Sequence, residues 1–219
     1  MFSSGSSYIS GDMTMELPTK PKFDPIKPQE VLDGTEIQYR FIPVPQHRYA
    51  PLKKSWKTDI YEPIRNDMKI DIRINLKARQ VELKTMPHTP DISNLDKCHS
   101  YVEAFMAGFD AEQIKDTFLK YDHFYLSTFN MNDVKRSLKG DHLARAIGRV
   151  CGKGGRTKFM IENATKTRIV VAAENVHIVG SFEGIKVAKD CVCRLVLGSP
   201  IGKIQSRLRT ISTRASERF

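Results

Sequence analysis

The spacing of apolar residues in the first half of the chain predicts a mixture of helices and strands. A helix is expected over residues 53–68, where large apolar side chains recur at four-residue steps. Residues 70–76 and 80–84 alternate between apolar and polar types, which predicts two strands joined as a hairpin. Two further helices are expected over residues 93–108 and 111–121. The order in this half is therefore helix, strand, strand, helix, helix.

The second half shows a different order of the same kinds of element. The predicted elements are a strand at 129–137, helices at 141–150 and 156–164, strands at 168–172 and 176–179, and a helix that begins after Ser181. Three glycines and a lysine, residues 152–155, separate the two short helices. The resulting order is β-α-loop-α-β-β-α.

Both ends of the chain differ in composition from the middle. Residues 1–35 contain few large apolar side chains, so we expect a disordered tail. The prolines of residues 39–45 predict an extended segment that lies along a folded surface. Residues 203–219 are basic, and their apolar positions allow one more helix.

Positive charge is concentrated in the C-terminal part of the chain. Residues 136–219 hold 17 Lys or Arg against 6 Asp or Glu, whereas residues 1–135 hold 18 against 19. This asymmetry favours a nucleic-acid partner for the second half, because each neutralised phosphate releases condensed counterions. A basic surface without a nucleic-acid partner is the simpler alternative.

Other features of the composition narrow the class of protein. No apolar run approaches the length of about 20 residues that spans a bilayer, so we expect no membrane partner. The N-terminus shows no secretory signal, and four cysteines are too few for a disulfide scaffold, so nucleus or cytosol is expected. Cys191 and Cys193 lack a matching Cys/His pair nearby, so we predict packed thiols rather than a metal site or another cofactor site. No arrangement of histidine, carboxylate and hydroxyl indicates an enzyme.

The glycine loop at residues 152–155 carries the strongest functional signal. Glycine permits positive φ and lets the main chain approach a phosphodiester closely, and the amides that begin the next helix face the negative charge. Lys153 adds a cation at the tip. The spacing does not fit a nucleotide-binding P-loop, and the preceding segment is helical, which disfavours a dinucleotide-binding turn. A simple glycine-rich break between two helices remains the alternative to an RNA-binding loop.

The loop and its surroundings resemble a known family. Residues 150–157, Val-Cys-Gly-Lys-Gly-Gly-Arg-Thr, are similar to the signature of KH domains. Residues 138–149, 167–170 and 177–182, together with the ending Ser-Glu-Arg-Phe at 216–219, closely resemble one eukaryotic family, the Partner-of-Nob proteins. These are Pno/Dim-type KH proteins of small ribosomal subunit assembly, and the similarity spans roughly residues 40 to 219.

The resemblance implies a fold and a division into domains. It implies an α+β chain with two tandem KH-like domains, the first degenerate and without a GxxG loop, the second a type I KH domain of order β-α-α-β-β-α. The expected divisions are a disordered tail at 1–35, a degenerate KH-like domain at 36–130, a KH domain at 131–200 and a basic C-terminal helix at 201–219. Because the first domain lacks both loop and excess charge, we expect it to contact proteins or to pack against its neighbour.

The resemblance also implies which residues contact RNA. Val150, Ile161, Ile169 and Val171 would line an apolar groove, and main-chain groups of strand 168–172 would read base edges. From charge and from this resemblance together, the expected RNA-binding residues are Arg145, Arg149, Gly152, Lys153, Gly154, Gly155, Arg156, Lys158, Lys166, Arg168, Ile169, Arg207 and Arg209.

The function that the resemblance implies is non-enzymatic. Such a protein would bind pre-ribosomal RNA near the 3′ end of the small-subunit (18S) rRNA and position or regulate the Nob endonuclease in pre-40S maturation. Its partners would be that RNA, the Nob-type endonuclease, other pre-40S assembly factors and ribosomal proteins. It would reside in nucleus and nucleolus and shuttle to the cytoplasm. A KH subunit of another RNA-processing assembly, such as an exosome-type complex or an mRNA regulator, and a nucleotide-using enzyme are the alternatives.

Overall fold

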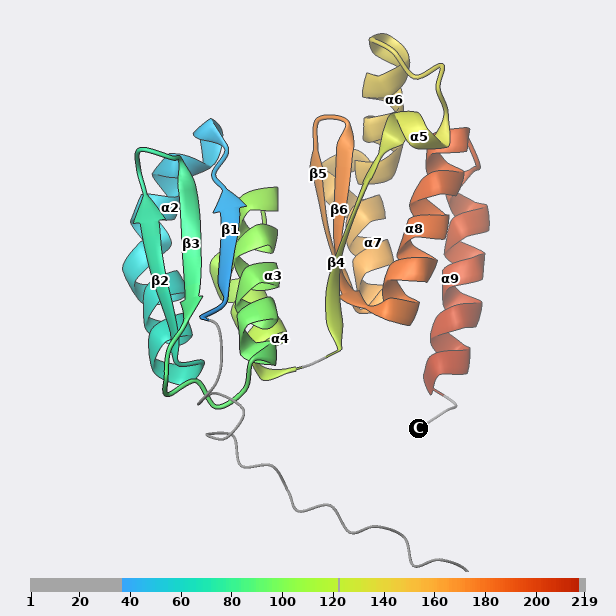
Figure 1. The fold of residues 1–219 in the computed structure, drawn as a ribbon. Helices are drawn as coiled ribbons and strands as arrows, with labels where there is room; N and C mark the ends of the chain where they lie inside the picture. Colours follow the sequence, from blue (N-terminus) through green and yellow to red (C-terminus); the bar gives the residue numbers. More distant parts are fainter. Residues whose placement is uncertain (1–36, 122, 217–219) are drawn as a thin grey trace, which may run out of the picture. The chain divides into compact units, whose positions relative to one another are not determined.

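The computed structural model describes residues 37–121 and 123–216, which belong to one compact unit. The tail predicted over residues 1–35 lies outside the described residues. None of the described helices is both long enough and apolar enough to cross a membrane. The described part contains two three-stranded antiparallel sheets, each covered by helices, which is the expected α+β class (Figure 1).

The first sheet has the strand order β1-β3-β2. Its strands are β1 (Tyr39–Pro43), β2 (Ile70–Asn75) and β3 (Gln80–Thr85). The predicted hairpin is confirmed, with Ile72 opposite Leu83, and both of these side chains are buried in the first core. The helices that follow β3 are α3 (Ser93–Ala107) and α4 (Ala111–Lys120), close to their predicted bounds.

Two predictions for the first half need correction. The segment expected to lie along a folded surface contains β1, which pairs along its whole length with β3. Its prolines are tolerated because β1 is an edge strand and needs hydrogen bonds on one side only. The helix expected to start at residue 53 instead starts as α2 (Tyr49–Ser55), after a 3₁₀ turn (Gln46–Arg48), and continues as two π-helical segments, Trp56–Tyr61 and Pro63–Asp67.

The second sheet has the strand order β4-β6-β5. Its strands are β4 (Phe124–Asn130), β5 (Arg168–Ala172) and β6 (Asn175–Ser181). Its helices are the short α5 (Met131–Val134), α6 (Asp141–Cys151), α7 (Arg156–Thr165), α8 (Phe182–Leu197) and α9 (Ile201–Ser216). Figure 1 shows α7, α8 and α9 side by side, and all three make contacts with one another. The predicted cap of α8 is confirmed, because the Ser181 hydroxyl accepts a hydrogen bond from the Gly184 N–H at 3.3 Å.

The strand predicted at residues 129–137 is wrong in position. β4 ends at Asn130, whose side chain accepts a hydrogen bond from the Asn132 N–H at 2.8 Å and so starts the helical turn α5. The strand itself lies upstream. Its two faces are packed in different cores, Leu126 against the first and Phe129 in the second, so its sequence does not show a simple alternation.

The two halves share one topology, and the first half differs from the second in lacking the glycine loop. In each, a strand, a helical segment, a hairpin and a helix follow one another, and the sheet order places the second hairpin strand in the middle. Where the second half has α6, the glycine loop and α7, the first half has helix running from Tyr49 through Asp67 with Glu62 as the only non-π residue between its π segments. The described helical segment of the first half, Tyr49 to Asp67, therefore has no glycine loop like that at residues 152–155.

The first half also covers the outer face of the second sheet. Val179 of β6 belongs to the first core, and Leu126 of β4 and Val170 of β5 pack against that core. At Gly108, the residue that ends α3, an added Cβ would lie only 3.1 Å from Val170 Cγ1. The sheet is therefore packed on both faces. Its edge strands are β4 and β5, and the unpaired edge of β5 lies beside α7.

The basic C-terminal segment is an integral part of the second core. Ile204 and Leu208 of α9 are 1% and 2% exposed and belong to the same buried cluster as the residues of α7 and α8. α9 therefore anchors one face of α7, and its arginines are exposed.

Candidate nucleic-acid interface

The loop between α6 and α7 is built from glycines in conformations that other residues avoid. Gly152 has φ 73° and ψ 174°, a region that essentially only glycine populates. Gly154 and Gly155 are left-handed, with φ 61° and 78°. An added Cβ at either of these two would meet nothing within 4 Å, so the outer side of the loop is open space.

Gly152 holds the loop tightly against the start of α7. A Cβ placed on Gly152 would lie 2.2 Å from Thr157 Oγ1 and 2.9 Å from the Thr157 main-chain nitrogen. No side chain caps the N-terminus of α7, although the Gly155 and Arg156 N–H groups donate to the Gly152 and Lys153 carbonyls. The glycine main chain, open on its outer side, and the exposed tip cation Lys153 make a cradle suited to a phosphodiester.

Helix α6 exposes two different sets of residues outside its buried Ala146 and Val150. One flank carries Arg145 and Arg149, and the Arg149 guanidinium lies near Gly198 at the end of α8. The other flank carries only small residues at helical spacing: Ala144, Gly148 and Cys151. The small flank adjoins the loop through Cys151 and leaves the main chain of α6 accessible.

The free edge of β5 offers main-chain groups for reading bases. The Ile169 N–H points away from β6 and donates to Glu162 Oε1 of α7 at 2.7 Å. Residues of an antiparallel strand alternate in direction, so the N–H and C=O of Val171, two positions on, also point to the free edge. We call the loop 152–155, the small flank of α6 and this edge of β5 the binding face.

The far end of the binding face is held rigidly. β5 and β6 are joined by a two-residue turn, in which Ala173 has φ 51°. The Glu174 carbonyl accepts the Met131 N–H at 2.9 Å, and the Glu174 carboxylate accepts from Asn132 Nδ2 at 2.8 Å. The hairpin is thus tied to α5, and β5 has little freedom to move when a ligand binds.

The structure brings part of the predicted site together. Lys153, Gly154, Gly155 and Arg156 lie at the loop, with both cations exposed. Lys158 lies one helical turn into α7, where its Nζ is 3.9 Å from Glu162 Oε1. The Ile169 side chain is 1% exposed, so it supports the edge from beneath and does not touch solvent.

Four other predicted residues lie on α6 and α9. Arg145 and Arg149 are exposed on α6, next to the side that carries Ala144 and Gly148. Arg207 on α9 forms an ion pair with Asp190 Oδ2 at 2.9 Å, and the same carboxylate is held by Arg194, so Arg207 has a structural partner. Arg209 is exposed on α9. Their contact with RNA stays a prediction.

Lys166 and Arg168 lie at the opposite end of α7 from the loop. Lys166 ends α7 in a left-handed conformation with φ 53°, and Arg168 begins β5. Both side chains are exposed.

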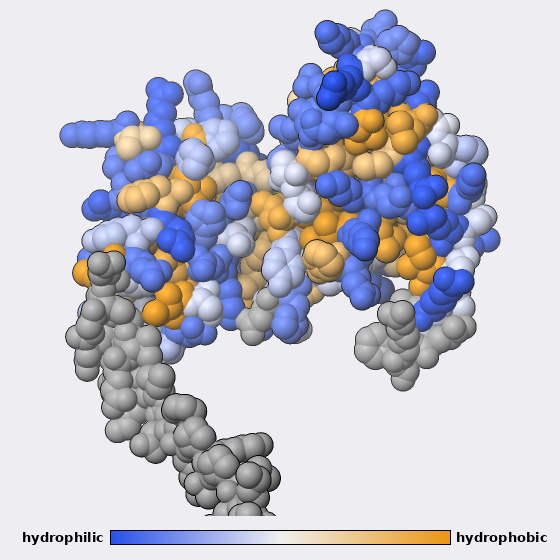
Figure 2. All heavy atoms as spheres, turned by 45° about the vertical axis from the view of Figure 1, so that its right-hand side comes forward, coloured by the Kyte–Doolittle hydropathy of each residue, from blue (hydrophilic) through white to orange (hydrophobic). Residues whose placement is uncertain are grey.

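In the space-filling view, hydrophilic side chains cover the upper end of the molecule, which carries α6 and the segment before it (Figure 2).

Sequence reasoning missed Glu162 and Gly148. Glu162 is 8% exposed and fixes the first outward N–H of β5, a role set by contact between two elements that the sequence alone does not pair. Gly148 could have been noticed, because a glycine inside a predicted helix needs a packing or functional reason.

Cysteines and histidines do not form a reactive cluster in the described residues. No group of three or more His, Cys, Asp or Glu side chains there could hold a metal ion. Burial raises the pKa of the Cys98 thiol to about 12 and also raises the pKa of Cys191 and of Cys193. Burial lowers the pKa of His177, whose Nδ1 lies 2.8 Å from Thr128 Oγ1.

The order of elements, the sheet β4-β6-β5 and the glycine loop between two helices define a type I KH domain, a class that grips single-stranded nucleic acid. Comparison with known proteins agrees. Residues 128–213 match the family model for the second KH domain of PNO1, described as a eukaryotic-type KH domain (KH-domain type I).

The chain belongs to the PNO1/Dim2 family of KH-domain RNA-binding proteins of pre-rRNA processing. It is 45% identical to the RNA-binding protein PNO1 of Oryzias latipes, over 95% of this chain and 85% of that protein. It is 50% identical to the RNA-binding protein pno1 of Dictyostelium discoideum, over 86% of this chain and 78% of that protein. The resemblance to Partner-of-Nob proteins is thereby confirmed.

Solved structures of relatives share the fold over about four fifths of this chain. Dim2p from Pyrococcus horikoshii OT3 superposes with a TM-score of 0.68 at 27% identity, over 79% of this chain and 99% of that chain. A chain of the a/eIF2alpha-aDim2p-rRNA complex from the same organism gives 0.70 at 27% identity, over 81% and 96%. The predicted pair of KH-like domains is confirmed.

Proposed function

We propose that this protein binds pre-ribosomal RNA near the 3′ end of the small-subunit 18S rRNA, and that it positions or regulates the Nob-type endonuclease in pre-40S maturation. The observation that carries the RNA-binding part is the binding face, which combines a glycine loop open on its outer side with a strand edge that has outward main-chain groups. Support for the kind of RNA comes from relatives named for pre-rRNA processing and from the archaeal relative whose complex contains rRNA.

The binding face suits a single strand of RNA that is bound and not chemically altered. The phosphodiester would lie against the open main chain at Gly154 and Gly155, and bases would stack over the small flank of α6. The outward N–H and C=O of Val171 would hydrogen-bond to a base edge. A KH domain grips about four nucleotides, so further specificity must come from additional contacts.

In-cell crosslinking followed by sequencing tests the RNA target. The wild-type chain should crosslink at the 3′ end of 18S rRNA in its precursor. The double variant Lys153→Glu with Gly154→Asp should lose these crosslinks, because it places carboxylates where the phosphate would lie and Asp tolerates the left-handed backbone at that position. The control is Lys53→Glu with Asn66→Asp, which makes the same charge change at exposed sites of the first half.

The outcomes of the crosslinking experiment separate clearly. Crosslinks at the 18S 3′ region that disappear in the loop variant and persist in the control support the proposal. Crosslinks confined to messenger RNA or to exosome substrates would instead favour the alternative assembly.

The proposed contact with the endonuclease falls on the first half. That half lacks the loop, and its outer sheet face exposes Tyr39 and Phe41, which are 48% and 55% exposed and have parallel rings. Exposed aromatic side chains of this kind are typical anchors of protein interfaces. Phe41→Glu should therefore weaken binding of the endonuclease while RNA affinity is unchanged, and equal loss of both would contradict this division of roles.

The proposed residence is nucleus and nucleolus with transfer to the cytoplasm, as expected of a factor that stays with the pre-40S particle. Imaging of the tagged chain while nuclear export is blocked tests this. The chain should then accumulate in the nucleus, and an unchanged cytoplasmic signal would contradict shuttling.

A further inference from the structure

Helix α9 carries a serine that follows two arginines at a fixed spacing. Ser212 has Arg209 three positions before it and Arg207 five positions before it. It is the only serine or threonine in the sequence with arginine at both of these positions. Basophilic protein kinases select their substrates by such arginines, because a guanidinium pairs with the carboxylates of the kinase in bidentate geometry.

The hydroxyl of Ser212 is exposed and is not held by the helix. Other hydroxyls of α9 donate to the main-chain carbonyl one turn earlier: Ser206 to Gly202 at 3.1 Å, Thr210 to Ser206 at 3.2 Å, and Thr213 to Arg209 at 3.0 Å. In the part of the chain that the structure describes, Ser212 Oγ has no such hydrogen bond. Ser212 is therefore free to act as the acceptor of a phosphoryl group.

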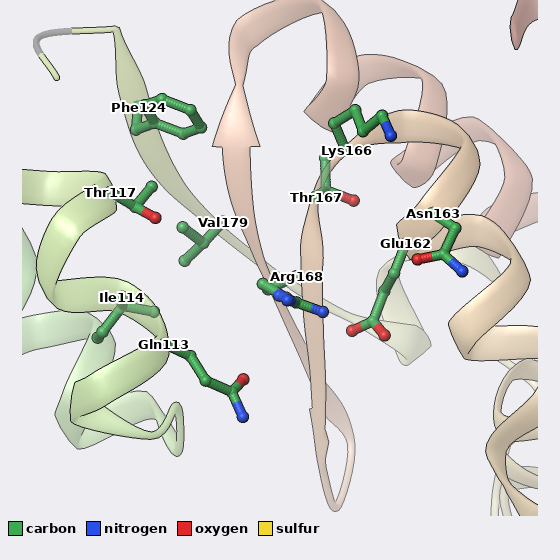
Figure 3. Close-up of a pocket in the computed structure, with 10 residues that line it drawn as sticks. All are labelled: Gln113, Ile114, Thr117, Phe124, Glu162, Asn163, Lys166, Thr167, Arg168 and Val179. Carbon is green, nitrogen blue, oxygen red and sulfur yellow. The ribbon is translucent and has the colours of Figure 1, made fainter.

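A second pair of exposed cations beside a hydroxyl shows the contrast. Lys166 and Arg168 flank Thr167 in the sequence and line a pocket of about 380 Å³ together with it (Figure 3). The Thr167 side chain is buried, and its Oγ1 lies 2.8 Å from Thr165 Oγ1. Neighbouring basic residues alone therefore do not make a modification site, and exposure distinguishes Ser212.

The end of α9 can open without disturbing the second core. Leu208 is buried in that core, whereas no side chain of residues 209–214 is buried. A kinase binds its acceptor segment in an extended form, and a segment with few buried contacts opens at a low cost in free energy. The exposed Arg207 stays on the helix, and its surface ion pair with Asp190 contributes little, so the guanidinium can turn to the kinase.

We propose that Ser212 is a phosphorylation site for a basophilic Ser/Thr kinase, and that the phosphate weakens RNA binding. In the reaction, Ser212 Oγ bonds to the γ-phosphorus of ATP, the bond from that phosphorus to the β-phosphate oxygen breaks, and ADP leaves. The hydroxyl proton passes to the catalytic aspartate of the kinase. The effect on RNA rests on the proposed RNA binding, whereas the modification site does not.

The phosphate changes the charge of α9 in two ways. The helix (Ile201–Ser216) holds four Lys or Arg and no Asp or Glu, and a phosphoserine carries about −1.5 to −2 charges at neutral pH. Arg209 lies one turn before Ser212 on the same side of the helix, so the phosphate pairs with it and withdraws it from RNA. Negative charge near the C-terminal end also opposes the helix dipole and loosens the last turn.

Phosphorylation of the full chain tests the site without RNA. The purified chain is incubated with ATP, Mg²⁺ and a kinase that selects arginine three positions before its acceptor, and mass spectrometry maps the product. Phosphate should appear on Ser212, and Ser212→Ala should stay unmodified. Phosphate on other residues alone, or none while the same kinase modifies a standard arginine-containing peptide, would overturn the assignment.

Matched arginine variants test why the kinase selects this serine. Arg209→Gln should slow phosphorylation by about tenfold, because a charge-assisted pair with the kinase is lost. The control Arg214→Gln removes the same charge at an exposed position of the same helix, after the serine, and should leave the rate nearly unchanged. Equal slowing in both variants would mean that net charge alone attracts the kinase, and would overturn the motif.

Fluorescence anisotropy measures the effect on RNA. The unmodified and the phosphorylated full chain are titrated onto a single-stranded RNA from the 3′ end of the small-subunit rRNA. The phosphorylated chain should bind about three- to tenfold more weakly, and the slope of log K against log salt should be smaller by about 0.7 for the lost contact of Arg209. Ser212→Ala taken through the same kinase reaction should bind like the unmodified chain.

The outcomes distinguish this inference from the proposed function. If the unmodified chain bound no RNA, the proposed function would be refuted, and the kinase assay alone would decide the site. Phosphate on Ser212 with unchanged RNA affinity would overturn the regulatory effect. A loss of affinity that a phosphatase reverses would support the inference.

Discussion

Gly152 is the loop position that tolerates a side chain least. With φ 73° and ψ 174°, an alanine there would carry strain of about 1–3 kcal/mol from the main chain alone. Its Cβ would also overlap Thr157, at 2.2 Å from Oγ1 and 2.9 Å from the main-chain nitrogen. The nitrogen belongs to the first turn of α7 and cannot move by a side-chain rotation. Relief therefore requires a shift of α7 itself, at a further cost of about 1–3 kcal/mol.

The matched comparison is Gly154→Ala. Gly154 is left-handed too, but its ψ is 28°, and nothing lies within 4 Å of the new methyl group. Its cost should be limited to the left-handed penalty of about 1–2 kcal/mol. We therefore expect Gly152→Ala to destabilise the chain more than Gly154→Ala.

Denaturant unfolding of both variants measures this difference, with near-UV circular dichroism to follow the fold. A Gly152→Ala variant at least about 2 kcal/mol less stable than the wild type corresponds to a fall of roughly 4–8 °C in Tm for a chain of this size. If the two alanine variants were equally stable, the tight contact between Gly152 and Thr157 would be refuted as the reason for glycine at this position.

The remaining predictions concern the supports of the binding face. Glu162→Ala should cost about 1–3 kcal/mol in chemical unfolding, because the buried Ile169 N–H loses its acceptor, whereas Glu162→Gln keeps an acceptor and should cost less; equal costs would refute the hydrogen bond. Leu208→Ala should cost about 2–5 kcal/mol in the same assay, because it opens a cavity in the second core, while Arg209→Gln should be neutral; the reverse order would mean that α9 is not packed as described. Burial lowers the pKa of His177 below 6.5, so the unfolded chain binds its proton first, and the stabilisation present above pH 6.5 is lost as pH falls below that value; a His177→Gln variant should show a smaller loss between pH 7 and 5, and an identical pH profile would contradict this.

Alternation and helical spacing were sufficient where each element packs on one face. The β2–β3 hairpin, α8 with its Ser181 cap and the strands around the β5–β6 turn follow directly from the sequence. The glycine loop could be predicted because three glycines and a lysine between two helices are expected in few other structures. The order of elements in the second half then indicated the KH class.

Prediction failed where packing on both sides or an unusual helix hid the pattern. β4 packs against the first half on one face and against its own core on the other, so its sequence lacks a clear alternation. The strand was therefore predicted too far downstream, at residues 129–137. The helix expected over residues 53–68 is π-helical on both sides of Glu62, and the changed hydrogen-bond register of these wider turns accommodates Pro63.

Residue types predicted the glycine loop, whereas contacts between elements could not be predicted. Arg207 is basic and lies in the same domain as the loop, yet it forms an ion pair with Asp190, a contact between α8 and α9 that its place in the sequence does not indicate. Glu162 could not be predicted from charge, because its carboxylate accepts a hydrogen bond from the Ile169 N–H of the neighbouring strand β5.

Amide chemical shifts during RNA titration test the central claim most directly. With a labelled full chain and a short single-stranded RNA, the largest shifts should fall on the amides of Gly154, Gly155 and Val171. The outer face of the first sheet, around Tyr39 and Phe41, should be unaffected. Saturable binding with unshifted amides at residues 152–155 and shifts elsewhere would contradict the account.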